Sequence, residues 1–527
     1  MKKFVRIMVL FTFVVLAVVF TACSKEEGEP DKSTEAPPTI TPYPTHEPYE
    51  FQEGNAKEFS VSGVFSDNMV IQRDQEIVIY GTAPESENGN IVNAFLKDLK
   101  GSGVIENGKW KVVMQGTLPA SKELGHSLKV VGEPGTDVIF EDVLIGDVWY
   151  INGQSNADLV FFPEAQKHYT EELKKVSRDM PLRYFTQMNW DLVGSPQLLE
   201  EPQENPLKRY KWKKADRTVV TSSPMMGYFF AAKMLELNPD VPIGIVNVAC
   251  GGASLAHLAP KEVVDKFPAG MKNKQLPINT LVVKDSGIYN AFMHPFIDFG
   301  IKGMLFYQGE SDTVSYKEYP EALNTYVQDL RDRFGEHFYF LNVQLSSYGY
   351  YAGNIPLTGI WDQINDLRNA QAKVRIDDIM YNYEIVPSLD CGWQEGDSDG
   401  AHPIYKKPIC DRLANIAAAL VYGIGDMENA ACPVPKDVRF ESDKVVIEFM
   451  YAGGGLKVNG DKLNGFEVLI NGKWDKIDAG IEGNKVIING DNIEGVRYGY
   501  DLRIEDPSQI TLVSGTDNPA VAFEVLK

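Results

Sequence analysis

The sequence predicts an α/β domain with a parallel sheet, flanked on each side by a β-sandwich-like domain. Between residues 142 and 430, apolar runs alternate with helical patterns, which is typical of parallel strands joined by crossover helices. Residues 58–141 and 431–527 show short alternating runs separated by Gly, Asn and Pro turns, which is typical of antiparallel β structure. With 527 residues and 44% hydrophobic content, the chain is long enough to build a core in each of two or three domains.

The first 23 residues have the pattern of a secretory signal. A positively charged segment at residues 2–6 precedes an apolar run from 9 to 20, and two small residues then lead to Cys23. These small residues before a cysteine resemble the lipobox of bacterial lipoproteins, in which the cysteine is diacylated and becomes the mature N-terminus. We therefore expect export and a membrane anchor at Cys23. A plain cleaved signal peptide of a secreted protein and an uncleaved anchor helix are the alternatives.

Composition identifies a stalk and argues against nucleic acid and metal as partners. Residues 24–57 are rich in Pro, Thr, Glu and Lys and are predicted to be disordered, because they have too few apolar side chains for a core. The 51 basic and 73 acidic residues give a formal charge of -22, with no basic run, so a phosphate backbone would be repelled. No Cys-x-x-Cys or His-x-x-x-His spacing suggests a metal site, and we predict neither a metal nor an organic cofactor. Cys391 and Cys410 are compatible with a disulfide, and equally with free buried thiols.

The spacing of apolar residues in the central region predicts its strands and helices. Apolar runs predict strands at 147–151, 182–185, 241–248, 301–307, 338–343 and 379–385. Helical patterns predict helices at about 224–235, 319–334, 361–374 and 405–422, with Ser222 and Ser223 as the N-cap of the first. In the flanking domains, strands are predicted at 69–71, 76–80, 110–114, 128–131, 444–449, 466–470 and 485–488.

Polar clusters that contain glycine follow three of the central strands. They are Gly-Gln-Ser-Asn at 153–156, Gly-Gly at 251–252 and Gln-Gly-Glu at 308–310, and a loop Asp-Gly-Ala-His at 399–402 precedes the last helix. Because an open parallel sheet binds its ligands at the carboxyl ends of its strands, we expect these segments to meet in one site.

The residue types of these segments fit acyl transfer. Ser155 is the predicted nucleophile, since a strand that ends in glycine makes a sharp turn and lifts one hydroxyl out of the sheet edge. His402 would take the proton of Ser155 and later protonate the leaving alcohol, and Asp399 would hold the imidazole tautomer. The simpler interpretation is that Ser155 caps a helix in a polar turn and that Asp-x-x-His occurs by chance.

The same clusters supply candidates for binding. Backbone N–H groups at Ser155 and at Gly251 or Gly252, with the side-chain amide of Gln308, are the predicted oxyanion hole. The candidates for substrate binding, from the same clusters, are Gln154, Asn156 and Glu310. Alternatively, the glycine pair is only a tight turn and Glu310 a surface or capping carboxylate.

A rival serine motif stands at 396–400, where Gly-Asp-Ser-Asp-Gly matches the Gly-x-Ser-x-Gly elbow of α/β-hydrolases. That elbow requires a buried strand before it and a histidine downstream. Residues 391–395 do not have a strand pattern, and no histidine follows His402. We therefore reject Ser398 as the nucleophile.

The motifs together resemble those of the SGNH hydrolases, specifically the sialate O-acetylesterase group of carbohydrate acetylesterases. The matching blocks are Gly-Gln-Ser-Asn at 153–156, Tyr-Gln-Gly-Glu-Ser at 307–311 and Asp-x-x-His-Pro at 399–403, with further likeness at 65–73, 241–247 and 496–500. The resemblance implies a flavodoxin-like, three-layer α/β/α catalytic domain. It also implies the triad Ser155, His402 and Asp399, and oxyanion donors from Ser155, the glycine pair and Gln308.

Two positions depart from the family pattern. Ala157 stands where the group usually has methionine, and Ala253 where it usually has threonine. Both are expected beside the pocket, and alanine at position 157 would enlarge it.

The sequence therefore predicts an exported serine esterase that hydrolyses O-acetyl esters on carbohydrates. The acetylated sugar stays open between sialic acid and a plant polysaccharide such as xylan. A carbohydrate-binding lipoprotein that keeps the scaffold without turnover is an alternative of another class. A glycosidase with two carboxylates is a third, although no acidic pair is marked by its position.

Overall fold

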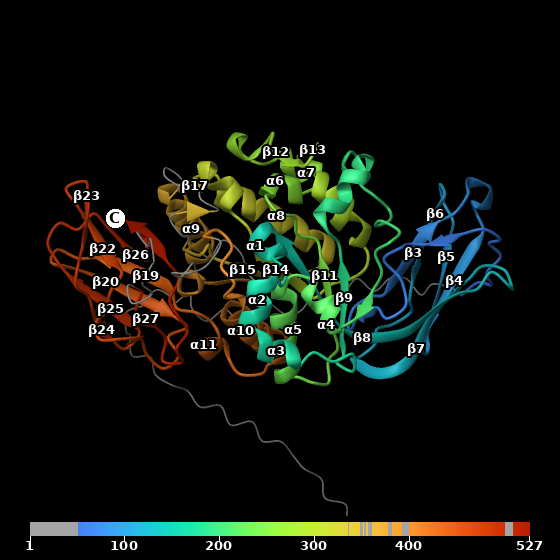
Figure 1. The fold of residues 1–527 in the computed structure, drawn as a ribbon, viewed down its shortest axis with the longest axis horizontal. Helices are drawn as coiled ribbons and strands as arrows, with labels where there is room; N and C mark the ends of the chain where they lie inside the picture. Colours follow the sequence, from blue (N-terminus) through green and yellow to red (C-terminus); the bar gives the residue numbers. More distant parts are fainter. Residues whose placement is uncertain are drawn as a thin grey trace, which may run out of the picture. The chain divides into compact units, whose positions relative to one another are not determined.

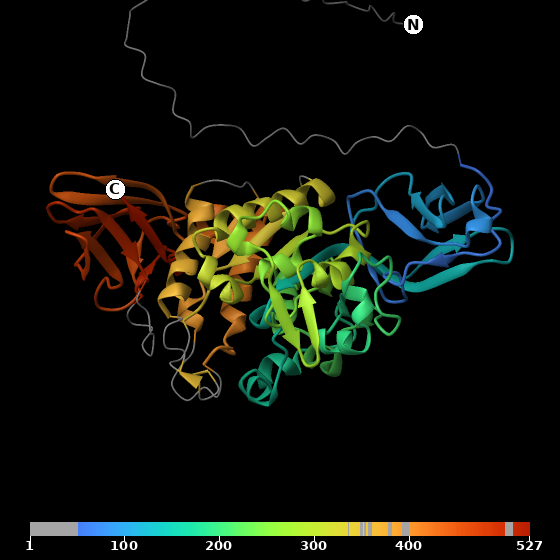
Figure 2. The same ribbon diagram turned by 90° about the horizontal axis from the view of Figure 1, so that it is seen from above.

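The computed structural model describes residues 51–527 apart from 336, 348–350, 353–354, 357–360, 378–381, 393–399 and 501–509. Residues 47–527 form one compact unit, which Figures 1 and 2 show from two directions. The predicted signal segment with Cys23, most of the stalk, Asp399 and Ser398 lie outside the described residues. Within the part that is described, no helix has the length and apolar character needed to cross a bilayer.

Two small antiparallel sheets form the region before residue 138. One has the order β1-β3-β6, and in the other β4 pairs with β5 and β7. The strands are β1 Ser60–Val61, β3 Val78–Thr82, β4 Ile91–Leu96, β5 Leu99–Val104, β6 Lys109–Val113 and β7 Ser121–Val131. In β6, Trp110 and Val112 are buried whereas the lysines beside them are exposed. The alternation seen in the sequence is therefore the alternation of core and solvent.

A single long strand joins this region to the central sheet. β8 (Val138–Gly153) begins antiparallel to β7, and its last residues pair in parallel with β11 (Ile243–Asn247) and β14 (Gly303–Tyr307). Its residues are partly exposed up to position 142 and continuously buried afterwards, because a parallel sheet is covered on both faces. The domain boundary expected between 141 and 142 thus falls inside one continuous strand.

The central sheet has the order β10-β9-β11-β8-β14-β15-β18, and its neighbours are parallel except β10 and β9. The remaining strands are β9 Leu182–Thr186, β10 Lys213–Lys214, β15 Tyr339–Val343 and β18 Tyr383–Val386, and β2 (Val70–Gln72) pairs with β8. The predicted central strands are confirmed to within two residues, except that β8 begins nine residues before position 147 and that residues 379–381 lie outside the described chain.

Helices cover both faces of this sheet. The rings of Trp149 and Phe230 are 5.0 Å apart, and those of the next strand residue, Tyr150, and Phe334 are 5.9 Å apart. Successive side chains of a strand point to opposite faces. α5 (Met225–Leu237) and α8 (Tyr319–Phe334), which carry the two phenylalanines, therefore lie on opposite faces. α10 (Lys406–Ala417) packs on α5 and α9 (Trp361–Ile376) on α8, which confirms the three-layer α/β/α class.

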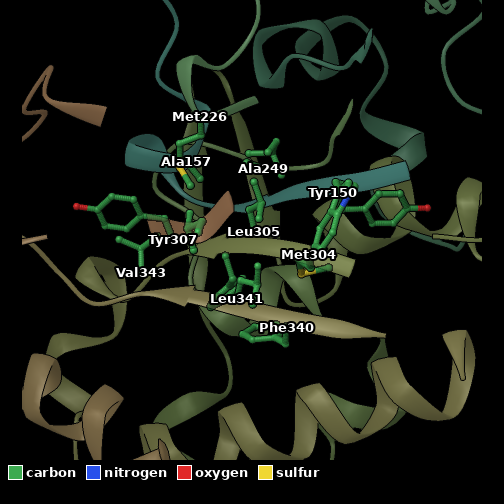
Figure 3. Close-up of a cluster of buried hydrophobic side chains, with 14 of the residues drawn as sticks. Tyr150, Ala157, Met226, Ala249, Met304, Leu305, Tyr307, Phe340, Leu341 and Val343 are labelled. Carbon is green, nitrogen blue, oxygen red and sulfur yellow. The ribbon is translucent and has the colours of Figure 1, made fainter. Parts of the chain in front are cut away.

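The core beneath the strand ends is made by residues of the neighbouring strands. Leu305 of β14 and Leu341 of β15 are register partners on these parallel strands, and Figure 3 shows both in one buried cluster with Tyr150 of β8. All three are fully buried. Ala157 lies in the same cluster, beside Met226 of α5. The segment that carries Ser155 is therefore packed directly on the apolar core.

Two antiparallel sheets form the C-terminal region, with the orders β19-β20-β25-β24 and β23-β22-β26-β28, and β21 pairs with β27. The strands are β19 Val434–Phe440, β20 Lys444–Met450, β21 Lys457–Val458, β22 Phe466–Ile470, β23 Lys473–Lys476, β24 Gly480–Glu482, β25 Lys485–Asn489, β26 Gly495–Tyr498, β27 Leu512–Val513 and β28 Phe523–Leu526. Phe449 of one sheet and Phe523 of the other lie 5.9 Å apart, centroid to centroid. The two sheets thus face each other across an apolar layer, as in a sandwich.

Two local predictions, the serine cap of α5 and the state of the cysteines, can be compared with the structure. The N-cap of α5 is Pro224, without a side-chain capping bond, whereas Ser223 Oγ donates to the carbonyl oxygen of Val219 at 2.8 Å. The predicted serine cap is therefore wrong, because these hydroxyls close the preceding turn instead. The cysteines of the described chain, Cys250, Cys391, Cys410 and Cys432, are free and buried, so the thiol alternative holds in this structure.

Candidate active site

Glycine makes the turn that presents Ser155. β8 ends at Gly153, whose φ is +131°, and the short helix α1 (Ser155–Asp158) begins two residues later. A Cβ atom at position 153 would lie 2.1 Å from the carbonyl oxygen of Tyr307, so only glycine fits between β8 and β14. Ser155 is partly exposed at the carboxyl end of the sheet.

Gly251 lies directly beside Ser155. The position that a Cβ atom of Gly251 would occupy is 3.8 Å from Ser155 Cβ, and the N–H of Cys250 donates to the carbonyl oxygen of Gly153 at 3.1 Å. Within the described chain, the backbone N–H groups of Ser155, Gly251 and Gly252 meet no hydrogen-bond acceptor. The structure thus brings two of the predicted clusters together and leaves backbone donors available in both.

Gln154 ties this turn to the loop after β14. Its Oε1 accepts hydrogen bonds from the backbone N–H of Ser311 at 3.1 Å and of Gly309 at 3.4 Å. Ser311 Oγ in turn donates to the carbonyl oxygen of Gly252 at 2.8 Å. Since Gln154 is only 4% exposed, its side chain belongs to the buried frame of the site. The sequence had suggested contact with substrate, and the structure places this residue beneath the surface.

The side chain of Asn156 connects three segments of the chain through hydrogen bonds. Its Nδ2 donates to Glu310 Oε1 at 2.8 Å and to the carbonyl oxygen of Ala401 at 3.1 Å, and its Oδ1 accepts from Lys406 Nζ at 2.7 Å. Asn156 is 1% exposed, so it too supports the site from within, contrary to the expected substrate contact. Glu310, by contrast, is partly exposed at the end of the loop after β14.

The residue before His402 is hydrogen-bonded to the segment that carries Ser155. Asn156 holds Ala401, and His402, which follows, is partly buried. Four residues further on, Lys406 lies in the first turn of α10, fully buried, with its ammonium 5.2 Å from the centroid of the Tyr307 ring. The loop of the predicted base is thus attached to the turn of the predicted nucleophile.

The amide of Gln308 is engaged within the protein. Its Nε2 donates to Asp312 Oδ2 at 2.8 Å and to the carbonyl oxygen of Ala253 at 3.2 Å, and its Oε1 accepts from the Tyr319 hydroxyl at 3.0 Å. The amide has only two hydrogens. A role as oxyanion donor would therefore require Gln308 to leave these acceptors, and in this structure it supports the turn at Ala253.

Asn189 is a neighbour of Ser155 that sequence reasoning missed. It begins the 3₁₀ turn η3 (Asn189–Gly194), and its Nδ2 lies 3.4 Å from the Cβ position of Gly251. The signal was available in principle, because Asn189 follows β9 at the carboxyl end of another central strand. The long charged and aromatic stretch around it concealed that relationship.

A carboxyl group with a raised pKa lies one helical turn from Ser155. Asp158 Oδ1 accepts a hydrogen bond from Asn247 Nδ2 at 2.8 Å. Removal from water raises the pKa of Asp158 to about 7, and the Asn247 bond opposes this shift. Burial, with the nearby Asp158 charge, also raises the pKa of the Cys250 thiol. Cys250 is therefore a neutral packed thiol, in agreement with the sequence interpretation.

His257, another ionisable residue, has a structural role. His257 Nδ1 accepts from the backbone N–H of Ser254 at 3.0 Å and caps the short helix α6 (Leu255–Leu258). Burial lowers the pKa of His257 to about 4, so the ring is neutral at pH 7. Among the described side chains, no three His, Cys, Asp or Glu groups are placed to share a metal ion.

The two departures from the family pattern lie in the core. Ala157 and Ala253 are both fully buried, and Ala157 packs beside Met226 (Figure 3). The expectation that a smaller side chain at position 157 enlarges the substrate pocket is therefore wrong, because the space is filled by apolar neighbours.

Comparison with known proteins agrees with this arrangement. Residues 145–398 match the family model of a carbohydrate esterase, sialic acid-specific acetylesterase. The sialate O-acetylesterases of Pongo abelii and Homo sapiens are each 24% identical over 365 residues, which is 65% of this chain. The chain spans 64% of the length of these curated relatives.

A solved structure has the same fold. The crystal structure of a carbohydrate acetylesterase from Xanthomonas citri superposes with a TM-score of 0.71 at 24% identity, covering 89% of this chain and 99% of that chain. The matched family and the names of the curated relatives describe the same kind of enzyme, and the turn of Ser155 lies within the matched residues. Residues 145–398, which make up most of the central domain, therefore match the sialic acid-specific acetylesterase family of carbohydrate esterases.

Proposed function

We propose that the protein is a serine esterase that removes O-acetyl groups from carbohydrates through an acyl-enzyme. The observation that carries this proposal is the placement of Gly251 beside Ser155, with the backbone N–H groups of Ser155, Gly251 and Gly252 unpaired within the described chain. All three residues are partly exposed, so these N–H groups can reach a bound ligand. Donors left open around a serine hydroxyl are what the oxyanion of an ester hydrolase requires.

The proposed reaction has two steps. Ser155 Oγ attacks the acetyl carbonyl carbon while His402 takes the hydroxyl proton, and the negative charge on the carbonyl oxygen is held by the open N–H groups. The bond from the carbonyl carbon to the sugar oxygen then breaks, and His402 returns the proton to that oxygen. A water molecule, deprotonated by His402, attacks the acetyl-serine, and acetate leaves as Ser155 regains its proton.

Three further roles belong to this proposal. Asp399 would hold the imidazole tautomer of His402, an assignment that rests on its position in the Asp-x-x-His motif. The Asn189 amide, next to Gly251, is a candidate for an additional oxyanion donor. Glu310, partly exposed at the same strand ends, remains the candidate for substrate contact. The names of the curated relatives favour O-acetylated sialic acid, and acetylated xylan is the alternative.

Acetate release tests the proposal. Residues 47–527, the compact unit, would be incubated with acetylated xylan, O-acetylated sialic acid and an aryl acetate, with Ser155→Ala as the control. Release from one glycan that the variant abolishes supports the proposal and identifies the sugar. An absence of release from all three, the aryl acetate included, would leave the binding-lipoprotein alternative.

We further propose that the protein is exported and anchored by a lipid at Cys23. The positively charged segment, the apolar run and the small residues before Cys23 support this. Metabolic labelling with palmitate should mark the full chain and not Cys23→Ala. Equal labelling of the two proteins, or none in either, would contradict the anchor.

A further inference from the structure

Trp190 directly follows Asn189, the residue whose side chain borders the predicted oxyanion donor Gly251. Asn189 Nδ2 lies 3.4 Å from the Cβ position of Gly251, and Ser155 Cβ lies 3.8 Å from the same point. Trp190 follows Asn189 directly, so its Cα atom lies about 3.8 Å from that of a residue whose side chain borders Gly251. Trp190 therefore belongs to the surroundings of the site.

The turn that carries Trp190 is firmly held. The Tyr210 hydroxyl donates to Asp191 Oδ2 at 2.5 Å and also accepts the backbone N–H of Met188 at 3.1 Å. Arg209 pairs with Asp191 Oδ1 at 2.6 Å, and Leu192 is fully buried. Both sides of Trp190 are therefore anchored, and the indole is presented from a fixed backbone.

The indole itself is left in water. Trp190 is 56% exposed, whereas Trp110, Trp149 and Trp212 are almost fully buried. Exposing so large an apolar side chain forgoes much of the stabilisation that its burial would supply. An exposed aromatic side chain on a firmly held backbone, next in the chain to a residue of the site, is suited to a ligand that has one apolar side.

A sugar ring is such a ligand. Its hydroxyl groups lie around the edge, and its faces present C–H bonds whose hydrogens carry a slight positive charge. The face of an indole ring is electron-rich, so the two surfaces attract each other and exclude water between them. The ester on the edge of the ring stays free to reach the serine.

We propose that Trp190 is the stacking platform for the sugar ring whose acetyl group is transferred to Ser155. The proposal rests on the proposed esterase function and names the part of the substrate that the site holds. It also makes Trp190 a determinant of specificity, because a small aryl acetate has no sugar ring to place on it.

The test compares substrates with and without a sugar. In residues 47–527, Trp190→Ala should lower kcat/KM on acetylated xylan or O-acetylated sialic acid about tenfold, mainly by raising KM. Its kcat/KM on an aryl acetate should change by less than about twofold, and Trp190→Phe should be intermediate. Leu526→Ala is the matched control, because Leu526 is 59% exposed on the C-terminal sheet. Equal losses on sugar and aryl substrates would overturn the proposal.

A binding measurement separates this proposal from the esterase itself. Xylohexaose and N-acetylneuraminic acid, which carry no ester, would be titrated into the protein by isothermal calorimetry. Saturable binding of either sugar that Trp190→Ala abolishes and Trp190→Phe weakens supports the platform, even if the wild type hydrolyses nothing. A wild type that hydrolyses the aryl acetate yet binds neither sugar, or binds one equally well without Trp190, overturns the platform and leaves the esterase intact.

Discussion

The side-chain amide of Asn156 donates a hydrogen bond to the carbonyl oxygen of Ala401 at 3.1 Å, across 245 residues of chain. Asn156 follows the predicted nucleophile and Ala401 precedes the predicted base. One buried amide therefore links the segments that carry the two residues on which the proposed reaction depends. Its Oδ1 also receives the buried ammonium of Lys406, so the same residue compensates a charge inside the protein.

Replacing this amide should impair catalysis more than its effect on stability explains. Asn156→Leu has a similar volume but cannot hold Ala401, and we expect kcat to fall at least about tenfold on any acetyl ester. Asn342→Leu is the control, since Asn342 is equally buried and donates to the Tyr383 hydroxyl at 2.7 Å. Both variants should lose a few kcal/mol of stability, about 2–4. Assays well below both melting temperatures that show equal kcat losses would refute the positioning role.

Ser155→Ala should reduce esterase activity at least about 10³-fold while thermal unfolding is unchanged, because only a partly exposed hydroxyl is removed. Steady-state hydrolysis of an aryl acetate measures the loss. Ser398→Ala, which changes the serine of the rejected motif, should keep most of the activity. The opposite ranking of the two variants would restore the rejected motif as the nucleophile.

Gly153→Ala should damage the nucleophile turn. At φ +131°, the new Cβ atom would lie 2.1 Å from the Tyr307 carbonyl oxygen, so β8 and β14 would have to separate. We expect a loss of more than about 3 kcal/mol in the free energy of unfolding, together with loss of activity. At Gly89, φ is +89° and nothing lies within 4 Å of the added atom, so Gly89→Ala should cost only about 1 kcal/mol. Urea unfolding that gives equal costs would contradict the steric argument.

Asp158 should make stability depend on pH. Removal from water raises its pKa to about 7, whereas the unfolded chain titrates near 3.9. Between these values the folded protein binds the additional proton, so stability falls as the pH rises from about 4 to about 7. The full penalty, present above pH 7, is at most about 4 kcal/mol.

Asp158→Asn keeps an oxygen that can accept the Asn247 bond and removes the titration. The melting temperature of this variant minus that of the wild type should therefore increase between pH 4.5 and pH 8. Asp240→Asn serves as the control, since Asp240 is exposed and pairs with Lys122 on the surface. A difference for Asp158→Asn that stays constant with pH would show that the carboxyl ionises normally.

The sequence by itself determined the layers of the fold and the segments that carry chemistry. Apolar periodicity predicted α8 at 319–334 and most ends of the central strands to within two residues, because that periodicity reports directly which side chains face a core. Glycine after a buried strand located the turns at Gly153 and Gly251, since only glycine tolerates the close approach at Gly153.

Only the tertiary structure decided which polar residues support the site and which can reach a ligand. Gln154, Asn156 and Gln308 looked like binding residues in the sequence, and the fold buries all three and uses their amides between segments. Asn189 came to the site from a stretch with little readable pattern. The physical reason is that local periodicity records burial against a core, whereas a hydrogen bond between residues hundreds of positions apart depends on which strands become neighbours in the sheet.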